Sequence, residues 1–99
     1  MRVADHLVER LRSSLAAEHV VVRDDSERHV GHEGARGGGG HYTVVVVAAC
    51  FAGLDLVARH RAVYGAVGEM IPGQIHALSI LSYTPEEWKK RPGGRDDAA

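Results

Sequence analysis

Histidine is the residue type in this chain that points most directly to chemistry. Seven of the 99 residues are histidine. A neutral imidazole is a common metal ligand, and it is the side chain that most readily gains a proton near neutral pH. The spacing and surroundings of these residues therefore decide what they can do. The seven are His6, His19, His29, His32, His41, His60 and His76.

The spacing of these histidines does not predict a closed zinc site. His29 and His32 form a pair separated by two residues in a polar segment, whereas structural zinc sites normally need four spaced ligands. We therefore do not expect autonomous zinc binding. His6 and His19 have no partner at ligand spacing. His60 lies on an apolar helical stripe, where we expect a buried imidazole with its hydrogen bonds satisfied.

Other chemistries receive little support. Cys50 is the only cysteine, so an intramolecular disulfide is impossible and a reducing compartment fits best. Because it ends an apolar strand pattern, we expect this thiol to behave as a small buried hydrophobe. The four glycines 37–40 are not followed by Lys-Ser or Lys-Thr, so they do not form a phosphate loop. No nucleophile and base, or pair of carboxylates, has a convincing spacing, and we expect no enzyme.

Composition is that of one ordinary globular domain. Twelve Lys and Arg are offset by thirteen Asp and Glu, so the chain lacks the basic excess typical of nucleic-acid binders. No apolar stretch is long enough to span a membrane, and the first residues do not resemble a signal peptide. We expect a cytoplasmic protein, or a mitochondrial matrix protein if the source is eukaryotic. The sequence leaves open whether it is a monomer or a weak dimer.

Hydrophobic periodicity predicts three helices and three strands that position these residues. Apolar residues at helical spacing predict a first helix over residues 2–17 and a second from Leu56 to Met70, stopped by Pro72 and Gly73. Residues 84–88 carry the signals of a third helix, with Thr84 as N-cap and Glu87 as its capping-box partner. Valine-rich or alternating runs predict strands at 19–24, 42–49 and 75–83.

These elements predict an α+β fold in the order αββαβα. The 42–49 run is apolar throughout, which is typical of a central strand, and both long helices can bury their stripes only against the sheet. We expect a three-stranded sheet with helices packed on it and one domain over residues 1–90. Residues 25–40 are expected to form a mobile loop, and residues 91–99 a disordered tail.

Several motifs together resemble the BolA-like family. They are HYTVVVV at 41–47, Phe51 with Gly53, VARHRAVY at 57–64, IHALSILSYTPEEW at 75–88, and DDSERHVGH at 24–32. The resemblance covers residues 2–88 in order and spacing. It implies a fold similar to the type II KH domain, which agrees with the topology expected from periodicity.

The resemblance also implies a function. BolA-like proteins with histidine in the loop between the first two strands are associated with monothiol glutaredoxins, and the two proteins hold a bridging [2Fe-2S] cluster. The implied ligands in this chain are His76, in the HAL motif, and a loop histidine, His29 first. His32 and His41 are alternatives for the second ligand. The partner contributes a cysteine and the thiolate of bound glutathione.

A nucleic-acid-binding transcriptional regulator is the second interpretation. Arg59 and Arg61 lie where the family's supposed DNA-binding helix falls, but alternate residues on a helix point about 200° apart and cannot form one patch. A packed or ion-paired helix is the alternative for this segment. The GxxG pattern by which KH domains grip nucleotides occurs at 31–34, with an acid inside it, and at 65–68, within a helix.

Overall fold

The computed structural model describes residues 2–25, 40–71 and 73–91. Most of the predicted loop, with His29 and His32, and residues 92–99 of the predicted 91–99 tail lie outside these ranges. The elements are α1 (Val3–Leu15), β1 (His19–Asp24), β2 (Gly40–Val47), η3 (Ala49–Phe51), α2 (Leu56–Val67), η4 (Gly68–Met70), β3 (Ile75–Tyr83) and α3 (Pro85–Lys90), where η3 and η4 are single 3-10 turns. The predicted αββαβα order is confirmed.

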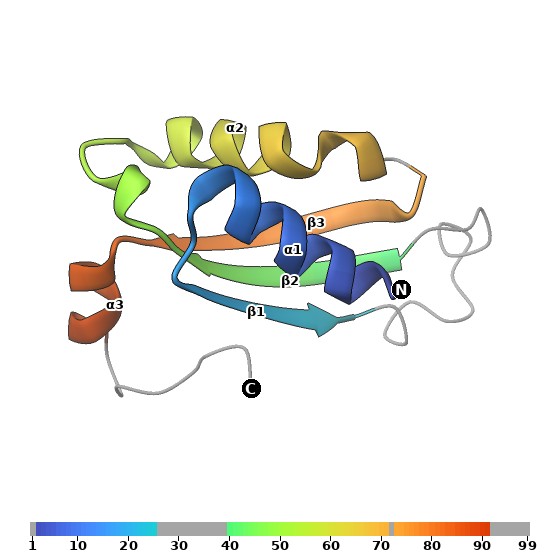
Figure 1. Ribbon diagram of the computed structural model, residues 1–99, viewed down its shortest axis with the longest axis horizontal. Coiled ribbons are helices and arrows are strands. Elements are labelled where there is room, and N and C mark those ends of the chain that lie inside the picture. The colour runs from blue at the N-terminus through green and yellow to red at the C-terminus, as the bar shows by residue number, and fades with distance from the viewer. Residues whose placement is uncertain (1, 26–39, 72, 92–99) are drawn as a thin grey trace.

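The sheet has the order β1-β2-β3, so the valine-rich β2 is the central strand, as predicted (Figure 1). β1 and β2 are antiparallel, with Val21 opposite Val45. β2 and β3 are parallel, with Val45 opposite Leu81. A parallel pair needs a crossover connection, and α2 supplies it. The chain therefore leaves the end of β2, returns through α2, and begins β3 beside the start of β2.

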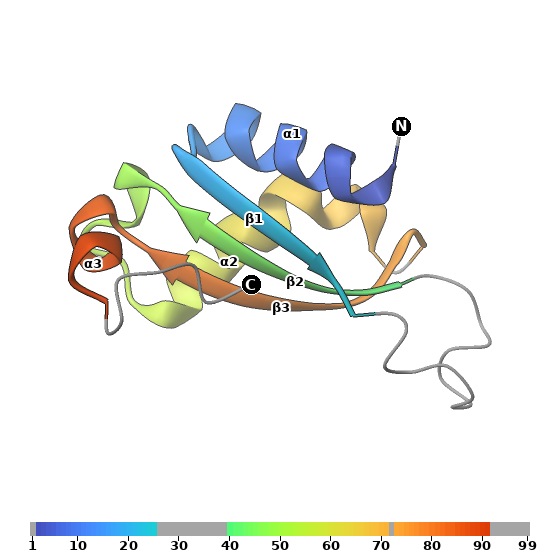
Figure 2. The ribbon, with the colours of Figure 1, turned by 90° about the horizontal axis from the view of Figure 1, so that it is seen from below.

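Helices α1 and α2 lie side by side on one face of the sheet (Figures 1 and 2). Alternate residues of β2 point toward them, as period-two strand geometry requires. The core is this layer of helix and strand side chains closed by Phe51. Its fully buried members include Leu7, Leu11, Val44, Val46, Phe51, Val63, Val67 and Ile75.

The opposite face of the sheet is closed at one end by α3. His19, Val47 and Tyr83 form one row across the three strands, and the Trp88 ring lies 5.2 Å from His19 and 5.1 Å from Tyr83 between centroids. Thr84 and Glu87 make the predicted capping box, with Pro85 at the first helical position. The cap starts α3 at the point from which the helix brings Trp88 onto this row. Val47, in the middle of the row, is only 1% exposed.

The orientation of α2 agrees with the prediction only in part, since Val63, Val67 and Met70 are buried as their helical spacing predicts, whereas the first turns differ. Arg59, Val63 and Val67 face the sheet, whereas Leu56 and His60 are exposed, so the expectation that His60 is buried was wrong. Both sides of this helix carry large apolar residues, so hydrophobic periodicity alone does not decide which side is buried. Arg59 supports the observed rotation, since its guanidinium donates to Leu54, Ser82 and Glu87 when it faces inward.

The expectation that Cys50 is a buried hydrophobe was also wrong. β2 ends at Val47, and Cys50 is exposed within η3, with its Sγ 3.5 Å from the Leu15 carbonyl oxygen. The tight turn rotates this side chain away from the sheet.

Within the described ranges, no helix is long and apolar enough to cross a bilayer.

The two-layer core predicts a clear cost for removing one buried side chain. Leu11 is fully buried on α1, and we expect Leu11→Ala to lower the free energy of unfolding by about 2–5 kcal/mol through lost burial and a residual cavity. Ser13→Ala, on the exposed side of the same helix, should change it by less than about 0.5 kcal/mol. Urea unfolding at neutral pH measures both, and equal costs would contradict the assigned helix face.

Candidate metal centre

His41 and His76 come together at one edge of the sheet. Each lies near the start of its strand, and because β2 and β3 are parallel, the two starts lie side by side. The imidazole rings are 5.2 Å apart between centroids, with their planes inclined at 49°. Two of the four histidines predicted as candidate ligands are therefore neighbours. His29 and His32 lie outside the described residues.

A register shift contributes to this arrangement. Gly40 pairs with Ile75 but His41 pairs with Ala77, so His76 is an additional residue on β3 between two paired positions. Such a bulge redirects a side chain, and bulges recur next to functional sites. Ile75 remains fully buried in the core, whereas His76 is exposed and His41 is half-buried. The bulge thus places His76 at the surface beside His41 without breaking the core.

The separation of the two rings suits metal ligation. With metal–nitrogen bonds of about 2.0–2.1 Å and about 1 Å from nitrogen to ring centre, two imidazoles on one tetrahedral metal have centroids roughly 5 Å apart. Among the described side chains, no three His, Cys, Asp or Glu residues are grouped to hold a metal ion. Cys50, the cysteine of this chain, follows the end of β2 that lies opposite to His41. The described part therefore supplies two imidazole donors and leaves other coordination positions to other groups.

A polar network beside His41 connects the end of β1 with β2. The Asp25 backbone N–H donates to the His41 carbonyl oxygen at 2.7 Å. The Asp25 carboxylate accepts from Arg23 Nε at 2.7 Å and from the Thr43 hydroxyl at 2.5 Å. The side chain of Asp25 is only 13% exposed. This network ties the end of β1 to the start of β2 and so fixes the backbone that carries His41. The sequence pattern does not indicate this network, because its Asp25–Thr43 bond joins residues 18 positions apart.

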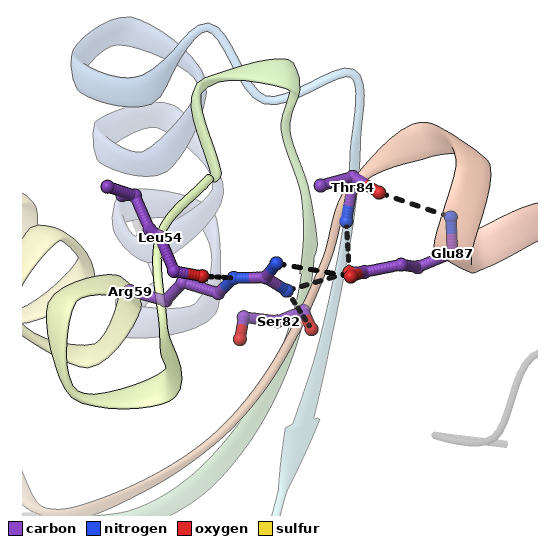
Figure 3. Close-up of polar contacts among 5 residues, drawn as sticks. All are labelled: Leu54, Arg59, Ser82, Thr84 and Glu87. Carbon is purple, nitrogen blue, oxygen red and sulfur yellow. Dashed lines mark hydrogen bonds and ion pairs between the residues drawn. The ribbon is translucent and has the colours of Figure 1, made fainter. Parts of the chain in front are cut away.

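A second polar cluster, far from the histidine pair, involves Arg59 (Figure 3). Its guanidinium donates to both carboxylate oxygens of Glu87, at 2.7 and 3.1 Å, and its Nε donates to the Leu54 carbonyl at 2.9 Å. The Ser82 carbonyl accepts a longer contact of 3.5 Å. The Arg59 side chain is only 11% exposed. Of the two arginines considered for DNA binding, Arg59 is thus packed and ion-paired, which was the alternative interpretation, and only Arg61 is exposed.

The Arg59 cluster changes the acidity of Glu87. Hydrogen bonds from the Arg59 guanidinium, and secondarily from the Thr84 backbone N–H at 2.8 Å, lower the pKa of Glu87 from 4.5 to about 2. The same hydrogen bond from Arg59 to Glu87 raises the pKa of Arg59. Glu87 thus serves as capping-box residue and as counter-ion, joining α3 to α2.

Comparison with known proteins identifies the family. A family model described as BolA-like protein matches residues 11–87. This chain belongs to the BolA-like family. It is 39% identical to Protein BOLA1, chloroplastic, of Arabidopsis thaliana, covering 85% of this chain and 54% of that protein. It is 35% identical to the DNA-binding transcriptional regulator BolA of Vibrio cholerae, covering 89% of this chain and 80% of the regulator.

Solved BolA structures share the fold. BolA1 from Arabidopsis thaliana matches with a TM-score of 0.75 and 38% identity, covering 88% of this chain and 96% of the other. Mouse BolA1 matches with a TM-score of 0.77 and 32% identity, covering 98% of this chain and 75% of the other. The BolA-like chain spans little more than half the length of the first curated relatives, 54% and 59%. The names of these relatives describe no catalysed reaction. The cytoplasmic location of this chain stays a prediction.

The Arg59–Glu87 contact predicts a specific response to acid. Because the pKa of Glu87 is lowered in the folded state, its stabilising effect is fully present above pH 4.5 and is lost as pH falls toward about 2. We expect Glu87→Gln to have a lower urea midpoint than the unsubstituted protein at pH 7. The difference should shrink progressively between pH 4.5 and 2.

The matched control is Glu86→Gln, which changes the neighbouring exposed carboxylate in the same helix turn. It should leave the urea midpoint nearly unchanged at every pH. If Glu87→Gln showed a constant deficit from pH 7 to pH 2, the ion pair would not be the source of the stabilisation.

Proposed function

We propose that this BolA-like chain shares a [2Fe-2S] cluster with a monothiol glutaredoxin and serves in cluster assembly, transfer or iron sensing. The observation that supports this most is the pair of His41 and His76 at the edge of the sheet, with rings 5.2 Å apart. Two imidazoles without further grouped ligands in the described part suit a cluster completed by another protein. The partner would supply a cysteine and the thiolate of glutathione.

Imidazole is a suitable donor for such a cluster. Iron–sulfur clusters accept two histidines in place of two cysteines on one iron, and this ligation raises the reduction potential. His76 is the first ligand of the proposal. The second is a histidine from the same edge or from the adjoining loop, namely His41, His29 or His32. His29 follows from the family resemblance, whereas His41 is favoured by its position beside His76.

The central test mixes this protein anaerobically with a cluster-loaded monothiol glutaredoxin and glutathione. We expect a one-to-one heterodimer by size exclusion, with visible absorption and circular dichroism distinct from those of the glutaredoxin alone. His76→Ala should abolish the new spectrum. His60→Ala is the matched control, because His60 is exposed on α2 and is not a proposed ligand.

Single alanine variants of His41, His29 and His32 identify the second ligand. The variant whose spectrum and cluster lifetime match those of His76→Ala removes a ligand, and the other two should leave both unchanged. An unchanged spectrum and lifetime in His76→Ala would show that the ligand assignment is wrong.

A DNA-binding regulator is the second candidate function. It is favoured by the name of the Vibrio cholerae relative, 35% identical over most of both proteins, and by the exposed side chain of Arg61. If this function holds, a gel shift with duplex DNA should weaken as salt rises, and Arg61→Ala should reduce it. Arg12→Ala, on the exposed side of α1, is the control. Absence of a shift at low salt would remove this candidate.

A further inference from the structure

The outer face of α2 exposes an unusual share of the large apolar side chains. Five such residues are exposed in the described part of the chain, and four of them belong to α2 or its lead-in. Leu56 is 66% exposed, Val57 59%, Tyr64 41% and Leu54 36%. Single exposed apolar residues are normal, but a contiguous group marks an interaction site. These residues contribute little to the protein's own core.

The exposed residues form one continuous surface. At 100° per residue, Leu56, Val57, His60, Arg61 and Tyr64 fall within an arc of about 140°, which we call the outer stripe. The sheet-facing side of the helix is occupied instead by Arg59, Val63, Ala66 and Val67. The outer stripe therefore runs from Leu56 to Tyr64, beside the side of α2 that is already buried.

The outer stripe is held rigidly. Near the start of α2, Arg59 is bound to Leu54 and Glu87, and near its end the Tyr64 hydroxyl donates to the Leu78 carbonyl oxygen at 3.3 Å. Both contacts fix the helix against the rest of the fold. A surface that is already ordered loses little conformational entropy when a partner binds.

The charge of the outer stripe restricts what can bind it. Helix α2 contains no Asp or Glu, whereas the outer stripe contains His60 and Arg61. Nowhere in the described ranges does another residue form an ion pair with Arg61. A second copy bound about a twofold axis would face this basic surface with itself, and its adjacent carboxylate, Asp55, already accepts the Ala58 N–H as the N-cap of α2. Duplex DNA would match Arg61 but would place phosphates against Leu56 and Val57, whose apolar surface gains nothing from them.

We infer that the outer stripe docks a partner protein through a segment that combines apolar side chains with carboxylates. The apolar side chains would cover Leu56, Val57 and Tyr64, and a carboxylate would pair with Arg61. None of these residues is a candidate ligand of the cluster, so the inference does not depend on the proposed function. The surface of one short helix corresponds to a small, transient interface of less than about 1,200 Å².

The probe for this interface is a synthetic amphipathic helical peptide with leucines on one face and glutamates along its edges. We expect its addition to the ¹⁵N-labelled full chain to shift amide signals of residues 54–64. Replacing both Leu56 and Val57 with serine should weaken binding by about tenfold or more, because two large apolar contacts are lost. Arg61→Glu should weaken binding at low salt, and raised salt should reduce the difference.

Matched variants separate this surface from general effects. Leu81→Ser removes the fifth exposed large apolar residue, 40% exposed, from the opposite face of the sheet, and Arg12→Glu reverses an exposed charge on α1. Both should bind the peptide as the unsubstituted protein does. All variants replace exposed side chains, and their amide spectra report whether the fold is retained.

Three outcomes would overturn the inference. Equal binding of a peptide with lysine in place of glutamate would show that charge plays no part. Self-association that the Leu56 and Val57 substitutions abolish would identify a second copy as the occupant. Duplex DNA that shifts residues 54–64, with binding unaffected by those substitutions, would make this a nucleic-acid surface.

Discussion

The parallel pairing of β2 and β3 is the constraint on which the candidate site depends. Parallel strands run in the same direction, so the residues at their starts, His41 and His76, lie at one edge although 34 other residues separate them in sequence. The same pairing requires a crossover, and α2 provides it over the face that also carries α1. An antiparallel hairpin of the same two strands would place the histidines at opposite ends of the sheet. The histidine pair and the two-layer core thus have one common cause.

Arg59 holds the crossover helix in its observed orientation together with the buried Val63 and Val67. A buried guanidinium needs partners for its donors, and it finds them in Glu87 of α3, the Leu54 carbonyl and the Ser82 carbonyl. Satisfying these donors turns Val63 and Val67 toward the sheet and leaves Leu56 and Val57 in solvent. This polar cluster therefore joins two helices and favours the orientation in which these apolar residues remain available to a partner.

Local signals in the sequence predicted most of the fold because they are strong and near in sequence. Residues 19–24 and 75–83 were predicted as strands with the observed bounds, and Thr84 and Glu87 form the predicted capping box. The errors have physical reasons. His60 is exposed, because periodicity could not decide between two apolar sides of α2. Cys50 is exposed, because a 3-10 turn begins where an apolar run would have continued the strand.

By itself the sequence determined the type and order of the elements, the family, and the set of histidines able to bind metal, since these follow from residue type and short spacing. The tertiary structure decided which histidines are neighbours, because that depends on the parallel register and the bulge at His76. It also revealed the bonds of Thr43 to Arg23 and Asp25 and the burial of Arg59, which arise from contacts between residues distant in sequence. Side-chain environment is a property of packing, and no periodicity in one segment reports what another segment will place against it.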